Sequence, residues 1–130
     1  MNDLATYFNN TPGSGVLSTA DRDGVVDAAL YARPHVLEGG TVAFIMPDHV
    51  THRNLQENPH AVYLFIEEHA SDGREWHGTR LYMTKIHEEK DTERLYAMRR
   101  RTSEGDREGR FLVVFSVDRV RPLVGGDLDA

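Results

Sequence analysis

The sequence contains no cysteine, which excludes disulfide bonds, thiolate zinc sites and thiol nucleophiles. No apolar run approaches the roughly 18 residues that a membrane-spanning helix needs. The first residues, MNDLATYFNNTPGSG, lack the basic region and apolar core of a signal peptide. Lysine and arginine number 15 against 21 acidic residues, and the net charge of −6 argues against nucleic acid or a membrane as the main partner. We therefore expect a cytoplasmic protein.

What the chain does contain is the composition of an ordinary globular protein. Its 130 residues are 39% hydrophobic and 28% charged, which suits one domain over residues 1–130 with a single core. No internal repeat, low-complexity segment or linker divides it.

Short apolar segments separated by turn signals predict six strands. Asp23-Gly24 favours a hairpin between the first two. Helices are expected at 3–10, at 50–57 with Asp48 or Thr51 as its cap, and at 91–101 with Asp91 as its cap. The predicted strands are 15–20, 25–34, 41–46, 60–68, 75–89 and 110–120.

Two of these strands are apolar on both faces, as VYLFI (62–66) and FLVVF (111–115) show. Six such strands with two or three short helices favour a mainly β fold: a six-stranded antiparallel split barrel of Greek-key type. So small a barrel has little of its own to cover an apolar outer wall. We therefore expect a partner subunit, and a homodimer is the simplest one.

The stretch MPDHVTHRNLQENP (46–59) raises a choice between two kinds of site. His49 and His52 are three residues apart, which on a helix suits a metal pair, but no third ligand follows. The alternative is a helix start after a strand, where free N–H groups, the Thr51 hydroxyl and Arg53 suit a phosphate. We favour the phosphate and expect no metal.

Other candidate residues are open to two interpretations each. Trp76 and His77 could stack on a cofactor ring, although a lone tryptophan in a strand is more often core or interface. Arg80 stands beside Tyr82 in a predicted strand, where a solvated cation is the simpler interpretation. The arginines at 99–101 complement the end of a helix.

Taken in order, these segments resemble the flavin-binding split-barrel family, which includes pyridoxamine 5′-phosphate oxidase and small bacterial FMN-binding proteins. GVLSTADRDGVVDAALYARPHVLEGGTVAFIMP is similar to its first hairpins, and HVTHRNLQENPHAVYLF to its phosphate-binding turn and helix. HGTRLYMTKIHEE resembles the strand after the next loop. The likeness covers about residues 13–90, with 110–120 as the last barrel strand, and NLQENP is its most specific part.

The resemblance implies an FMN-binding oxidoreductase or electron carrier, with FMN in a groove between two subunits. It assigns no catalytic residue, and Tyr31, His77 and Tyr82 are guesses for a proton donor. A rival is a non-catalytic module that stores or senses flavin, deazaflavin or haem. The implied cofactor-binding residues are Ala29, Leu30, Tyr31, Ala32, Phe44, Ile45, Met46, His49, Val50, Thr51, Arg53, Asn54, Trp76, His77, Arg80 and Tyr82.

The sequence departs from the family pattern at one place. Many members carry an Arg-Lys pair three and four positions before the asparagine of this motif, and here Val50 and Thr51 occupy those positions. The phosphate must then meet Thr51, backbone N–H groups, His52 or Arg53, or Arg80 from elsewhere. The oxidase's substrate residues lie largely in a C-terminal extension that this chain lacks, so we do not expect that activity.

Overall fold

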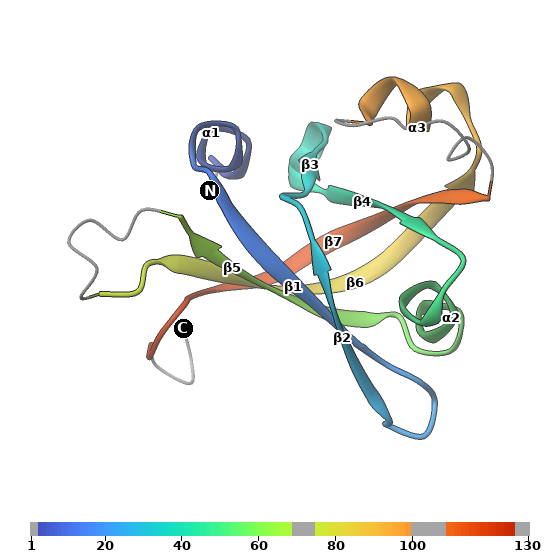
Figure 1. Cartoon of the computed structure of the whole chain (residues 1–130), viewed down its shortest axis with the longest axis horizontal. Coiled ribbons are helices and arrows are strands. Elements are labelled where there is room, and N and C mark those ends of the chain that lie inside the picture. The colour runs from blue at the N-terminus through green and yellow to red at the C-terminus, as the bar shows by residue number, and fades with distance from the viewer. Residues whose placement is uncertain (1–2, 69–74, 100–108, 127–130) are drawn as a thin grey trace.

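One antiparallel sheet of seven strands curls into a half-barrel, with three short helices around it (Figure 1). The computed structural model describes residues 3–68, 75–99 and 109–126. The strand order across the sheet is β2-β1-β5-β6-β7-β4-β3, so β2 and β3 are its edges. The elements are α1 (Leu4–Asn10), β1 (Gly13–Ala20), β2 (Val26–Tyr31), β3 (His35–Val36), the 3₁₀ turn η1 (Glu38–Gly40), β4 (Val42–Pro47), α2 (Val50–Glu57), β5 (His60–Glu67), β6 (Gly78–Lys90), α3 (Glu93–Met98) and β7 (Arg110–Pro122).

The predicted split barrel is confirmed, with one strand more than expected. The addition is β3, whose two residues pair with the start of β4. Two residues are too few to show an alternating pattern, so the sequence gives no signal for it. The predicted 25–34 strand ends earlier, at Tyr31, and the predicted 75–89 strand begins later, at Gly78.

The turn between β1 and β2 forms as its sequence predicts. The Asp21 carboxylate accepts hydrogen bonds from the backbone N–H groups of Asp23 and Val25, at 2.8 and 2.9 Å. Gly24 has φ +84°, a left-handed conformation that glycine adopts without steric cost. The turn therefore brings β2 back along β1 in antiparallel register.

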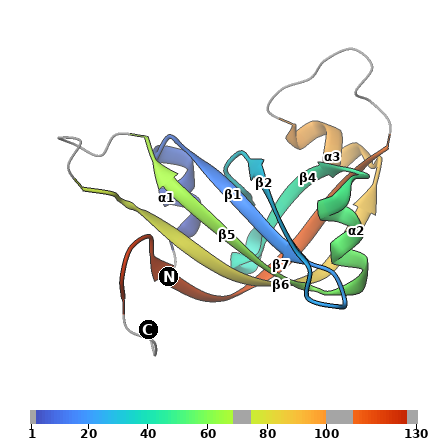
Figure 2. The ribbon, with the colours of Figure 1, turned by 60° about the horizontal axis from the view of Figure 1, so that its bottom comes forward.

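The core fills the concave side of the sheet. Inward-facing residues alternate along β1 and β5, where Leu17, Tyr63 and Phe65 are fully buried. Phe8 of α1 and Leu55 of α2 pack against the same cluster. Figures 1 and 2 show these two helices at opposite ends of the curl, so each closes one end of the core.

The outer wall is covered in part by the chain itself. Leu112 and Val114 of β7 are buried on the convex side, where they form a second cluster with Ala43 and with Leu95 of α3. The apolar outer face of β7 therefore needs no partner subunit. Across β2, β1 and β5 the outer wall has no such cover among the described residues, and Leu30 there is 79% exposed.

The caps predicted for α2 and α3 are wrong. His49, not Asp48 or Thr51, is the N-cap of α2, and it makes no side-chain cap bond. Thr92, not Asp91, caps α3 by accepting from the Leu95 N–H at 3.2 Å. The α3 helix ends at Met98, and positions 100 and 101 of the predicted helix lie outside the described residues. No helix in the described ranges is long and apolar enough to cross a membrane.

Candidate functional site

Helix α2 is fixed to the sheet by its buried face. Leu55 is buried in the core, and the Asn54 amide donates to the Thr19 hydroxyl of β1 over 3.0 Å. Asn54 is therefore a structural contact in this chain. The first turn of α2 follows directly from β4, and Thr51 within that turn is 4% exposed.

A pocket of about 280 Å³ opens beside this turn, between the ends of β2, β4 and β7. We call it the arginine pocket, because three of the eight described residues that line it are arginines and none of those eight is acidic. In a chain of net charge −6, such a gathering of positive charge is a local feature and not the general character of the surface. It is lined by Tyr31, Ala32, Arg33, His35, Phe44, Ile45, Arg99 and Arg110.

Tyr31 connects the arginine pocket with the start of α2. The pKa of Tyr31 is raised, chiefly by burial and also by the charge of Asp27. A hydrogen bond with the Thr51 side chain and the charge of Arg110 act in the opposite direction. The Tyr63 hydroxyl donates to the Tyr31 carbonyl over 2.9 Å. Tyr31 is thus held from the core side, with Thr51 and Arg110 both close enough to act on its phenol.

Two of the arginines are held by contacts, Arg33 with α1 and Arg99 with its own helix α3. Arg33 donates to the Phe8 carbonyl at the end of α1 over 2.7 Å. The Arg99 guanidinium lies 5.8 Å from the centre of the Tyr96 ring. Arg110 begins β7 and pairs with Pro47, the last residue of β4. The pocket therefore has cations that are positioned by the fold.

The two histidines of the opening motif differ in their surroundings. His49 is exposed at the N-cap of α2. His52 is buried, and its two ring nitrogens face the carboxylates of Asp48 and Glu88. His52 is thus engaged with carboxylates and does not offer its ring to a phosphate. Within the described ranges, no group of three or more His, Cys, Asp or Glu side chains could hold a metal ion.

The structure brings together only some of the predicted cofactor-binding residues. Tyr31, Ala32, Phe44 and Ile45 line the arginine pocket, and Thr51 adjoins it. Met46 is part of the core, with no exposed surface. The remaining predicted residues of these elements do not line the pocket: Ala29, Leu30, His49, Val50, Arg53 and Asn54.

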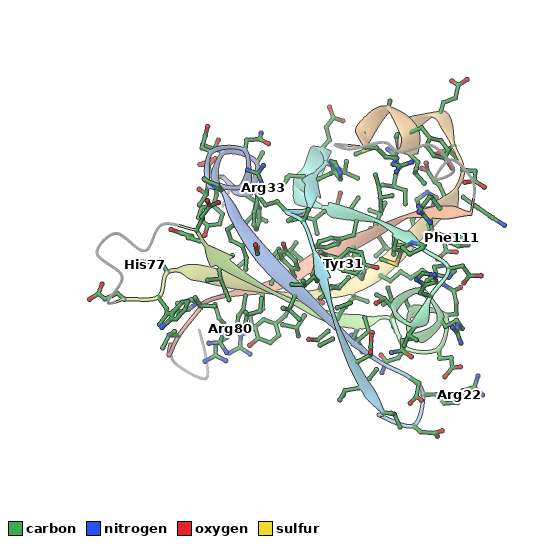
Figure 3. The ribbon with its side chains drawn as sticks, viewed as in Figure 1. Arg22, Tyr31, Arg33, His77, Arg80 and Phe111 are labelled. Carbon is green, nitrogen blue, oxygen red and sulfur yellow. The ribbon has the colours of Figure 1, made fainter. Side chains whose placement is uncertain are left out.

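Four predicted residues lie elsewhere in the chain. Figure 3 shows His77 and Arg80 at the end of the sheet away from α2. Arg80 donates to the carbonyls of Pro122 and Gly125, both over 2.8 Å, so it holds the segment after β7. Trp76 is 67% exposed. The centre of the Tyr82 ring lies 5.8 Å from the Arg119 guanidinium. Within one chain, none of the four lines the arginine pocket.

Among the described residues that line the pocket, sequence reasoning missed three arginines and a histidine: Arg33, His35, Arg99 and Arg110. Each lies at or beyond the end of an element, where no periodic pattern marks it. Arg110 reaches the site because β7 pairs with β4 in antiparallel register. Only that long-range pairing identifies it.

No family model matches the sequence, and no curated protein matches it. Solved structures do match over almost the whole chain. An FMN-binding protein from Syntrophomonas wolfei subsp. wolfei has a TM-score of 0.77 at 19% identity, covering 95% of this chain and 86% of its own. An F420 reductase has a TM-score of 0.61 at 15% identity, covering 93% of this chain and 98% of its own. HutZ, the haem storage protein from Vibrio cholerae, has a TM-score of 0.69 at 16% identity, covering 89% of this chain and 89% of its own. The fold is therefore that of the flavin-binding split barrels, as the motif resemblance predicted.

Proposed function

We propose that the protein binds FMN and acts as a flavin oxidoreductase or electron carrier. The observation that carries this proposal is the arginine pocket beside the first turn of α2, on a fold that matches an FMN-binding protein. Bound FMN would supply the redox chemistry, and the chain would supply its position and electrostatic surroundings.

The phosphate of the cofactor has suitable partners at this site. Free N–H groups at the start of a helix attract anions, and Thr51 offers a hydroxyl in the same turn. Arg110 supplies the positive charge that the Arg-Lys pair provides in the family pattern, since guanidinium groups bind phosphate oxygens with two parallel hydrogen bonds. The cation thus comes from β7 instead of α2.

We also propose a homodimer, because one part of the outer wall is apolar and exposed. Leu30 of β2, Val16 of β1 and Leu64 of β5 stand side by side in register across three strands. On β6, Arg80 pairs with Leu64 and so continues this row, while Tyr82 pairs with Val62 in the neighbouring row. A second copy on this wall would place a partner's Arg80 and Tyr82 at the interface, where the family holds its flavin.

The experiment compares FMN with riboflavin, which lacks the phosphate. Thr51→Ala removes a hydrogen bond to a charged group, which is worth about 1.5–3 kcal/mol, so FMN affinity should fall roughly 10- to 100-fold. Arg110→Gln should weaken FMN binding as well, while Arg22→Gln, an exposed arginine on the β1–β2 turn, should not. Riboflavin should lose much less affinity in every variant.

Fluorescence quenching titrations measure these affinities. Equal losses for FMN and riboflavin, or no loss for FMN, would show that the phosphate binds elsewhere, and Arg80 would be tested next. The absorption spectrum of the purified protein checks the cofactor itself: flavin bands support the proposal, and a Soret band would favour haem. Turnover with a reduced nicotinamide and an electron acceptor separates an enzyme from a storage or sensing module.

A further inference from the structure

Three arginines gather on the outer face of β6 and β7, at the end of the sheet away from α2. Arg80 and Arg121 stand directly opposite each other in the ladder between these strands, and Arg119 stands opposite Tyr82. Leu81 faces the core with no exposed surface, so the alternation along β6 directs Arg80 and Tyr82 to the outer wall. Figure 3 shows Arg80 at this end of the sheet. We call Arg80, Arg119 and Arg121 the outer arginine cluster.

Two arginines of the cluster converge on the turn after β7. Arg80 Nη2 and Arg121 Nη2 both donate to the Gly125 carbonyl, over 2.8 and 3.2 Å. Arg80 Nε also donates to the Pro122 carbonyl over 2.8 Å, and Arg121 Nη2 to the Gly126 carbonyl over 3.3 Å. Because the two guanidinium groups share one acceptor, their positive charges lie within a few ångströms of each other.

Tyr82 positions the two arginines that β7 contributes. The Arg119 guanidinium lies 5.8 Å from the centre of the Tyr82 ring, and Arg121 Nη1 donates to the Tyr82 hydroxyl over 3.3 Å. The cluster is therefore held in place by one aromatic side chain and one turn of the backbone, and its geometry exists before any ligand arrives.

The positive charge of this cluster is not balanced within the part of the chain that the structure describes. Neither Arg80 nor Arg121 forms an ion pair with a carboxylate there. Asp118 of β7 instead accepts hydrogen bonds from the hydroxyls of Thr84 and Ser116, at 2.5 and 3.0 Å. Backbone carbonyls carry no net charge, and like charges directly opposite in a ladder destabilise a sheet. The chain thus keeps an unfavourable pair of cations at this place.

The hydrogen-bonding capacity of the cluster is not filled either. A guanidinium has five N–H donors, and Arg80 uses Nε and Nη2 on the turn. Its Nη1 has no partner among the described residues, so one edge of the fork is available. Arg121 Nε is buried and also lacks a partner among the residues described. Such donors mark places where a water molecule or an ion completes a structure.

We propose that the outer arginine cluster is a second anion site, which binds the phosphate or diphosphate group of a ligand other than FMN. The planar guanidinium fork matches phosphate oxygens with two parallel hydrogen bonds. A multiply charged group also offsets the repulsion between Arg80 and Arg121 more fully than one carboxylate does. The arginine pocket lies at the other end of the sheet, so within one chain the two sites take separate anions.

The first test uses the protein without cofactor and follows the Nε–Hε signals of its arginines by NMR. Pyrophosphate is added at constant ionic strength, and inorganic phosphate and acetate are titrated in parallel. We expect the Arg80 and Arg121 signals to shift and saturate at millimolar pyrophosphate or below, with phosphate binding more weakly and acetate causing no shift at the same concentration. No shift with pyrophosphate, or an equal response to acetate, would overturn the proposal.

Arg119→Gln removes one charge of the cluster and leaves the bonds of Arg80 and Arg121 to the turn in place. Loss of hydrogen bonds to a charged group should raise the dissociation constant of pyrophosphate roughly tenfold or more. Arg121→Gln should do the same. Arg22→Gln, whose substituted side chain is 73% exposed on the β1–β2 turn, is the matched control and should bind like wild type. Wild-type affinity in Arg119→Gln would overturn the proposal, even if Arg121→Gln did not fold.

The second test separates this site from the proposed FMN site. In Arg110→Gln, which alters the arginine pocket, the response of Arg80 and Arg121 to pyrophosphate should persist, and Arg119→Gln should bind FMN like wild type. Absence of any FMN binding would contradict the proposed function alone, because the pyrophosphate titration uses no cofactor. If Arg119→Gln weakened the binding of FMN but not of riboflavin, the cluster would hold the FMN phosphate itself, and the proposal of a second site would be overturned.

Discussion

Asn54 of α2 donates a buried hydrogen bond to the Thr19 hydroxyl of β1, 3.0 Å away, and this contact fastens the helix to the sheet. Asn54→Ala removes this amide donor, so the buried Thr19 hydroxyl loses the hydrogen bond. The free energy of unfolding should fall by about 1–3 kcal/mol. Urea denaturation at pH 7 measures the change. Arg53→Ala, at the adjacent exposed position, should change it by less than about 0.5 kcal/mol. Equal losses in both variants would contradict the structural role of Asn54.

Gly15 of β1 lies against the ring of Tyr63, and a Cβ at this glycine would approach that ring to 2.2 Å. Gly15→Ala should therefore displace Tyr63 and, with it, the hydrogen bond to the Tyr31 carbonyl. The expected loss of stability is about 1–3 kcal/mol, as for other overpacked sites. Thermal and urea unfolding measure it, with the exposed neighbour Ser14→Ala as the control. A stable Gly15→Ala protein with unchanged Tyr31 resonances would refute this prediction.

Leu30→Glu tests the proposed dimer, since it places a charge at the most exposed residue of the apolar row on β2, β1 and β5, on the edge strand β2. We expect the wild type to sediment as a dimer at micromolar concentration and this variant as a monomer. Ile86→Glu, at another exposed apolar residue, should remain dimeric, and circular dichroism should show that both are folded. A monomeric wild type would remove the basis for a shared groove.

Glu88 should make stability depend on pH in the acid range. Its pKa is lowered from 4.5 to about 2 in the folded protein, so its contribution is fully present above pH 4.5 and is lost as the pH falls toward 2. Glu88→Gln should be less stable than wild type at pH 7, and its free energy of unfolding should vary less between pH 5 and pH 2. Urea denaturation across that range checks the slope. Parallel curves for the two proteins would show that Glu88 is not the group responsible.

Local patterns in the sequence determined the strands, the α2 helix and the fold. Apolar segments bounded by turn residues are recognisable one at a time, because strand formation and hairpin turns depend on neighbouring residues. The motif NLQENP marked α2 and the strand after it correctly. What local patterns could not supply was the very short β3, or the choice of His49 and Thr92 as helix caps.

The candidate site, in contrast, was decided by tertiary structure. Arg110 comes near Tyr31 only because β7 pairs with β4, and the sequence offers no reason to choose it over the other arginines. Burial likewise separated two histidines that look alike in sequence: His49 is exposed, while His52 is enclosed by Phe111 and two carboxylates. Periodicity identifies which face of an element is apolar, whereas the identity of the residues that meet there depends on strand pairing between distant parts of the chain.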